Sequence, residues 1–197
     1  MTETEALHCL FRQLAIDNCS ESYKQLFVRM QPSLVRFAFG ILKSEALAFE
    51  VVSDVFIRIW EKRDTLQHVD SPRSYLYQAV KNEAINALHQ QERRQLHDAL
   101  VWAVPAESVF FNPEQQLISK ETLAALQRAV QELPPKCRTI FKLVKEDGLK
   151  YREVAALLDL SVKTVEAQMG IAIKRLASCM QLQLPARQAG AKAVAKK

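Results

Sequence analysis

Apolar residues recur at spacings of three and four along most of this 197-residue chain, and this helical periodicity restricts its fold most. Between residues 22 and 42 one such stripe consists of Tyr23, Leu26, Phe27, Met30, Leu34, Ala38 and Ile41. No segment alternates apolar and polar residues as a half-buried strand would, and four glycines leave few positions for tight β-turns. The sequence therefore predicts an all-α fold.

Further stripes predict helices over residues 45–63 and 72–94, with a short helix at 3–16. Ser71 can cap the second of these, and Pro72 suits a first helical turn. One arc of that helix is apolar and would face a core: Leu76, Tyr77, Val80, Ala84, Ala87 and Leu88. A shared core would make residues 1–94 a first small domain.

Residues 95–112 lose this periodicity and contain Pro105, which predicts a linker. A second helical domain is expected over residues 113–180. It begins at the capping sequence Asn112-Pro113, and Pro134-Pro135 interrupts its first stripe: Leu123, Leu126, Val130 and Leu133. A helix closed by Gly148 follows, then helices over 151–158 and 162–179. Residues 181–197 form a basic tail rich in Ala, Gln and Lys, which predicts disorder.

Charge and composition exclude several classes of protein. The formal net charge of +5 divides into 0 over residues 1–95 (12 basic, 12 acidic), −2 over 96–112, +3 over 113–180 and +4 in the tail. Only the second half therefore suggests a nucleic-acid partner. No apolar stretch approaches a membrane span, and four separated cysteines indicate free thiols in a reducing cytosol. No phosphate-loop, metalloprotease or nucleophile-elbow motif occurs, so we expect no enzyme, metal, cofactor or small-molecule substrate.

The strongest functional pattern is a short helix, a three-residue turn and a longer helix over residues 151–176, which is typical of a helix-turn-helix. Residues facing outward from the second helix would meet base edges in a major groove: Lys163, Thr164, Glu166, Ala167 and Gly170. Basic side chains around them could contact phosphates, among them Arg138, Arg152 and Lys174. The alternative is an αα-hairpin with a solvated charged face.

Two outward faces in the first domain are weaker signals. Tyr75, Asn82 and Asn86 lie opposite the core arc of their helix, and an aromatic–amide face can stack on unpaired bases. Asp54, Ile57, Arg58 and Glu61 form a mixed-charge face with an exposed isoleucine, which could contact a protein. For both faces, simple solvation is the alternative interpretation.

Three motifs in order resemble bacterial sigma factors of the extracytoplasmic-function (ECF) group. The segment 132–141 (ELPPKCRTIF), with 148–155 and 160–166, resembles sigma region four. The segment 52–60 (VSDVFIRIW) resembles the region-two helix that docks on RNA polymerase, and 71–82 (SPRSYLYQAVKN) resembles the segment that melts the promoter. The family often has Trp where Tyr75 stands.

The resemblance implies a role for each face. The beta-prime subunit of core RNA polymerase would bind the face formed by Asp54, Ile57, Arg58 and Glu61. The beta subunit of the polymerase is expected to be a partner as well. The promoter-melting and minus-ten-reading positions would be Tyr75, Lys81, Asn82 and Asn86. The minus-thirty-five contacts would come from Arg138, Arg152, Lys163, Thr164, Glu166, Ala167, Gly170 and Lys174.

The resemblance also implies a cytoplasmic protein that reaches the nucleoid through RNA polymerase, binds promoter DNA and is controlled by an anti-sigma factor. The runner-up is a helix-turn-helix regulator that binds operator DNA without polymerase, with the first domain as a sensor or dimeriser. A third option is a helical protein-interaction module.

Overall fold

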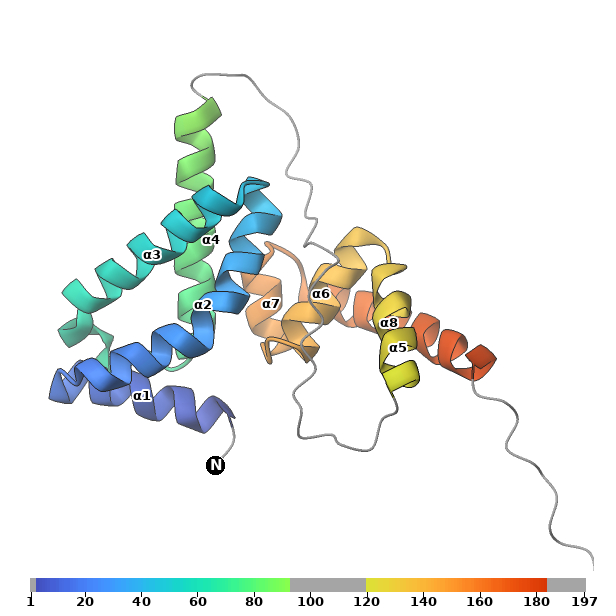
Figure 1. Cartoon of the computed structure of the whole chain (residues 1–197), viewed down its shortest axis with the longest axis horizontal. Helices are drawn as coiled ribbons and strands as arrows, with labels where there is room; N and C mark the ends of the chain where they lie inside the picture. The colour runs from blue at the N-terminus through green and yellow to red at the C-terminus, as the bar shows by residue number, and fades with distance from the viewer. Residues whose placement is uncertain (1–2, 93–119, 184–197) are drawn as a thin grey trace, which may run out of the picture.

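A computed structural model describes residues 3–92 and 120–183, and every regular element within these ranges is helical. The all-α prediction is confirmed. The N-terminal domain comprises α1 (Glu3–Asp17), α2 (Ser20–Leu42), α3 (Glu45–Glu61), the 3₁₀-helix η1 (Arg63–His68) and α4 (Pro72–Glu92). The C-terminal domain comprises α5 (Lys120–Gln131), α6 (Pro135–Lys145), α7 (Tyr151–Leu157) and α8 (Val162–Gln183) (Figure 1).

The N-terminal core forms where α2, α3 and α4 pack together. The predicted stripes supply its buried side chains, including Leu26, Leu34, Val52, Phe56, Leu76 and Tyr77. Ring contacts join the helices: Phe27 meets Phe56 at 4.9 Å between centroids, and Phe37 meets Tyr77 at 5.1 Å, both edge-to-face. The apolar side of α4 is therefore fixed against α2 and α3, and its other sides face outward or toward the second domain.

Local sequence explains where these helices begin and end. Ser44 caps α3 because its Oγ accepts a hydrogen bond from the Leu47 amide at 3.4 Å. Pro32 lies inside α2, where it removes one backbone donor, and α2 changes direction part-way along its length (Figure 1). The helix predicted over 45–63 ends at Glu61, and η1 follows it. Sequence periodicity gave no sign of η1, because so short a 3₁₀ segment carries no 3.6-residue stripe.

The C-terminal domain contains the predicted helix-turn-helix. Val154, Ala155 and Leu157 of α7 are buried, and α8 buries Val165, Met169, Ala172 and Leu176 in the same core. Ser161 caps α8, since its Oγ accepts a hydrogen bond from the Thr164 amide at 3.0 Å. Gly148 follows α6 with φ +68°, a left-handed conformation that favours glycine, as predicted for this helix end.

Some predictions concern residues outside the described ranges. These are the linker 95–112, the capping sequence at 112–113, and the tail beyond residue 183. Helix α8 continues to Gln183, past the end predicted at Cys179.

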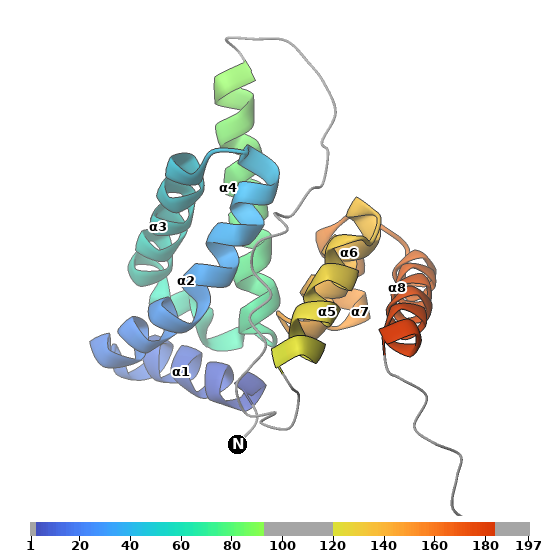
Figure 2. The ribbon, with the colours of Figure 1, turned by 45° about the vertical axis from the view of Figure 1, so that its right-hand side comes forward.

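The two domains are separate helical bundles that touch (Figure 2). Contact between them runs chiefly from α4 to α7, the first helix of the helix-turn-helix. Ser71 shows why sequence alone misses this contact. It precedes α4 as predicted, but its hydroxyl donates to Glu153 Oε1 of α7 at 2.7 Å.

Replacing Leu26 with Ala should lower the free energy of unfolding by about 2–5 kcal/mol, because the side chain is fully buried and its loss leaves a cavity. Val28 lies on the same helix and is 70% exposed, so Val28→Ala should change stability by less than about 0.5 kcal/mol. Urea denaturation followed by circular dichroism measures both. Equal effects would contradict the assignment of this side of α2 to the core.

Candidate nucleic-acid interface

The outward side of α8 forms one continuous face, here called the recognition face. Successive residues of an α-helix are rotated by about 100° around its axis. An arc about 100° wide therefore contains Lys163, Glu166, Ala167, Gly170 and Lys174, and Thr164 widens it by about 60°. All of these residues are exposed except Gly170, which is half-buried. A Cβ built on Gly170 would meet no atom within 4 Å, so the backbone is open to close approach there. The C-terminal domain thus presents the helix surface that groove binding requires.

The two predicted backbone-contact arginines have different surroundings. Arg152 is exposed at the start of α7. Arg138 is half-buried, and its Nη1 donates to the Gln131 carbonyl at the end of α5 at 2.9 Å. Arg138 would have to give up or share this bond in order to bind a phosphate, whereas Arg152 would not need to move.

Helix α4 brings together three of its four predicted promoter-melting residues. Tyr75, Asn82 and Asn86 are exposed and lie within about 40° of one another around the helix; we call them the aromatic–amide face. Tyr75 also meets Phe11 of α1 edge-to-face at 6.1 Å, which limits the positions of its ring. Lys81 lies about 120° away from Tyr75, is 5% exposed, and forms an ion pair with Asp159 of the helix-turn-helix turn. The structure therefore separates Lys81 from the other three.

The predicted docking face on α3 is present at the surface. Ile57 is 53% exposed, Glu61 is exposed and Asp54 is half-buried. Arg58 forms a two-pronged ion pair with Glu83 of α4, with Nη2 to Oε1 at 2.8 Å and Nη1 to Oε2 as the second bond. Hydrogen bonding to Glu83 raises the pKa of Arg58. Arg58 thus joins α3 to α4 while part of it stays on the surface.

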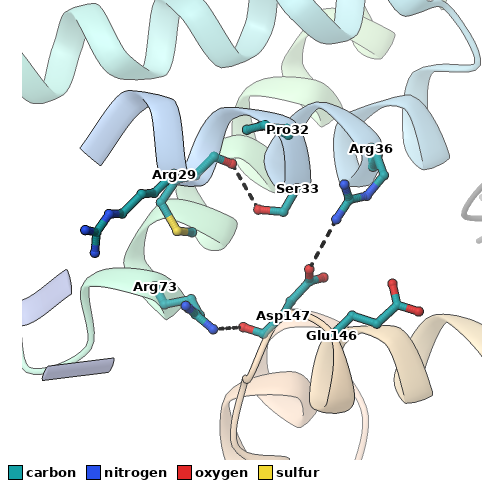
Figure 3. Close-up of a pocket in the computed structure, with 8 residues that line it drawn as sticks. Arg29, Pro32, Ser33, Arg36, Arg73, Glu146 and Asp147 are labelled. Carbon is teal, nitrogen blue, oxygen red and sulfur yellow. Dashed lines mark hydrogen bonds and ion pairs between the residues drawn. The ribbon is translucent and has the colours of Figure 1, made fainter. Parts of the chain in front are cut away.

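Charged groups also meet where the end of α6 approaches α2 and α4, beside a cavity of about 310 Å³ (Figure 3). An Asp147 carboxylate oxygen lies 3.7 Å from Arg36 Nη2, and the Asp147 carbonyl accepts a hydrogen bond from Arg73. Burial raises the pKa of Asp147, although Arg36, Arg73 and Lys142 oppose this. Burial likewise raises the pKa of Glu146 to about 7, with Asp147 adding to the shift while Lys142 and Arg36 reduce it.

Sequence reasoning missed the partners in these contacts: Arg36, Arg73, Glu83, Asp147, Glu153 and Asp159. Each pair is separated by at least 25 residues, from 25 for Arg58–Glu83 to 111 (147 − 36) for Arg36–Asp147. No local spacing rule reaches so far, and each of these residues resembles an ordinary surface charge in the sequence.

Comparison with known proteins matches both domains. Residues 26–94 match Sigma-70 region 2, and residues 123–176 match Sigma-70, region 4. The ECF RNA polymerase sigma-E factors of Escherichia coli K12 and Salmonella typhimurium LT2 are each 30% identical to this chain over 157 residues, covering 76% of it and 81% of theirs. The chain belongs to the ECF sigma-factor family.

This sigma factor directs promoter recognition by RNA polymerase and, like its family, is not an enzyme. The region-2 match sets aside the stand-alone regulator, whose first domain would be a sensor or dimeriser. The Bartonella quintana sigma factor RpoE, solved in complex with the anti-sigma factor NepR, shares the fold at a TM-score of 0.50 and 20% identity, over 83% of this chain and 99% of that one.

No helix within 3–92 or 120–183 is long and apolar enough to cross a membrane. In the same ranges, no group of three or more His, Cys, Asp or Glu side chains is placed to hold a metal ion.

Glu146 should make stability depend on pH. Its pKa is about 7 in the folded protein against an ordinary 4.5, so the folded state holds more protons between these values and stability falls as pH rises from 4.5 through 7. Glu146→Gln should remove much of this dependence and raise the unfolding free energy at pH 8 by about 1–2 kcal/mol, allowing for partial exposure.

Urea denaturation at pH 5.5 and pH 8 measures the effect. Glu132→Gln, at an exposed position just after α5, should keep the wild-type pH profile. A Glu146→Gln protein with an unchanged profile would contradict the burial of this carboxyl as the cause.

Proposed function

We propose that the two domains of this sigma factor divide promoter recognition, with the recognition face of α8 reading the upstream element and the aromatic–amide face of α4 binding unpaired bases of the downstream element. The observation that carries this assignment is that both faces are exposed to solvent. Five of the six recognition-face residues and all three aromatic–amide residues are exposed, although the domains touch elsewhere.

The chemistry of each face suits a different form of DNA. Lys163 and Glu166 can bond to base edges that a duplex displays in its major groove. Tyr75 offers a ring for stacking, and Asn82 and Asn86 offer amides for the Watson–Crick edges of splayed bases. Binding energy on α4 would then offset part of the cost of separating the strands.

We also propose that the docking face on α3 binds the beta-prime subunit of core RNA polymerase. The protein would contact the beta subunit of the same polymerase as well. Ile57 supports this: its side chain is apolar, more than half exposed and bordered by charged residues, as in the centre of a protein interface. A protein with this role would be cytoplasmic and would associate with the nucleoid by binding RNA polymerase. Control by an anti-sigma factor is part of it, supported by the fold shared with an anti-sigma-bound relative.

Replacing Ile57 with Ala should weaken binding to core RNA polymerase by about 1–2 kcal/mol, because the variant loses apolar area at the interface. Ile16 is a matched control, since the same residue type is 52% exposed on α1, outside the docking face. Competition binding to fluorescently labelled core enzyme gives both affinities. Equal binding by Ile57→Ala and Ile16→Ala would remove α3 from the interface.

Replacing Lys163 and Glu166 with Ala should relax sequence discrimination in the upstream element by about 1–3 kcal/mol at each base pair that these two side chains read. Reconstituted holoenzyme and a promoter library randomised in that element measure the change. Lys145→Ala removes an exposed charge from α6 and should leave the preferred sequence unaltered. If the double variant keeps wild-type discrimination, readout lies elsewhere. If the wild-type holoenzyme initiates from no promoter, the proposed function fails.

A further inference from the structure

One edge of the recognition face is apolar. Ile171 on α8 is 41% exposed, and helix geometry places it about 80° from Lys163, within the arc of this face. Ala167 and Thr164, both exposed, lie on either side of it around the helix. Together these three residues, here called the apolar stripe, occupy an arc of about 60° and extend about 10 Å along the helix axis.

Thr164 contributes a methyl group to the apolar stripe. Its Oγ1 lies 2.8 Å from Ser161 Oγ, and the two hydroxyls share a hydrogen bond at the start of α8. The same Ser161 oxygen accepts a hydrogen bond from the Thr164 amide at 3.0 Å. Because the Thr164 hydroxyl already has a partner within the protein, its methyl group is the part that remains for an apolar contact.

The apolar stripe lies within a polar surface. Lys163 and Lys174 flank it at about 40° and 20° from Ala167 around the helix, and Glu166 lies beyond them. All three charged side chains are exposed. A surface that binds another protein presents a contiguous apolar patch of a few hundred square ångströms, which three side chains of this size beside charges do not provide. The pattern suits a ligand that carries small apolar groups among hydrogen-bonding atoms.

Thymine is the base that carries such a group. In the major groove it displays a methyl group at C5 beside the O4 acceptor, and the other three bases display no apolar group there. Base pairs are stacked about 3.4 Å apart, so a stripe of about 10 Å is as long as three base-pair steps. The open backbone at Gly170 allows α8 to approach the base edges closely. The apolar stripe can therefore reach methyl groups of more than one base pair.

We propose that the apolar stripe selects thymine in the upstream promoter element, with Ile171 making the largest contact to a thymine methyl group. The inference rests on the proposed reading of this element by α8, and it adds Ile171 as a specificity-determining residue. The recognition face is then divided: Lys163 and Glu166 bond to polar base edges, while the apolar stripe removes a methyl group from water. Burial of one methyl group corresponds to about a fourfold change in affinity.

Replacement of thymine by deoxyuridine tests the methyl contact, because the two bases differ only at C5, where uracil carries hydrogen. The upstream element that the wild-type holoenzyme prefers is first selected from a promoter library. Each thymine of that element, on either strand, is then replaced singly. Competition against a fluorescently labelled promoter gives the affinity of the holoenzyme for each duplex. At one or more positions, the deoxyuridine promoter should bind about threefold to fivefold less tightly than the thymine promoter.

Ile171→Ala identifies the side chain that makes the contact. This variant holoenzyme should bind the thymine promoter less tightly than wild type, and its penalty for deoxyuridine at the sensitive position should fall below about twofold. The matched control is Ile173→Ala, because Ile173 is 51% exposed on the same helix but lies about 160° from Ile171. The control should keep the wild-type penalty. Both side chains are exposed, so neither variant should lose its fold.

Equal binding of the thymine and deoxyuridine promoters by wild type at every position overturns the inference. A penalty that is unchanged in Ile171→Ala, or lost equally in Ile173→Ala, also overturns it. Failure of the proposed function gives a different result, since Lys163→Ala, Glu166→Ala would then keep wild-type discrimination, and the inference would fail with it. If that double variant relaxes discrimination while deoxyuridine has no effect, α8 reads the upstream element and only the methyl contact is wrong.

Discussion

Burial of one side of α4 is the constraint on which the rest of this structure depends. Leu76, Tyr77, Val80 and Ala84 are fully buried against the N-terminal core, so the helix cannot rotate. Its two remaining sides therefore have fixed directions. One presents the aromatic–amide face to solvent, and the other places Arg73 and Lys81 against the C-terminal domain. A single amphipathic helix thus serves as a core element, a candidate base-binding surface and half of a domain interface.

The contact between the domains uses part of the positive charge of the N-terminal domain. The N-terminal domain is balanced overall, with 12 basic and 12 acidic groups up to residue 95. Three of its cations, however, meet carboxylates or a carbonyl of the other domain. Fewer positive charges are therefore available to phosphates than the count suggests. This charge distribution suits a factor that reaches promoters as part of a larger enzyme.

Sequence patterns predicted the helices and the exposed faces well, because both depend on spacing within one segment. The buried stripe of α2, the cap at Ser161 and the left-handed Gly148 are local features of this kind. The ends of elements were less predictable: η1 is too short to show a period, and the α8 sequence has no stop signal at Cys179. The contacts of Lys81 and Arg58 could not be predicted, because their partners Asp159 and Glu83 are 78 and 25 residues away. Ion pairing across such distances follows from the fold and not from any local pattern.

The two-pronged pair between Arg58 and Glu83 has a mechanical consequence. A planar guanidinium bound to both oxygens of a carboxylate resists rotation as well as separation. The pair thus adds to the core packing in fixing α4, which carries Tyr75, relative to α3, which carries Ile57. A partner bound to α3 would therefore also fix the direction in which the Tyr75 ring of α4 faces.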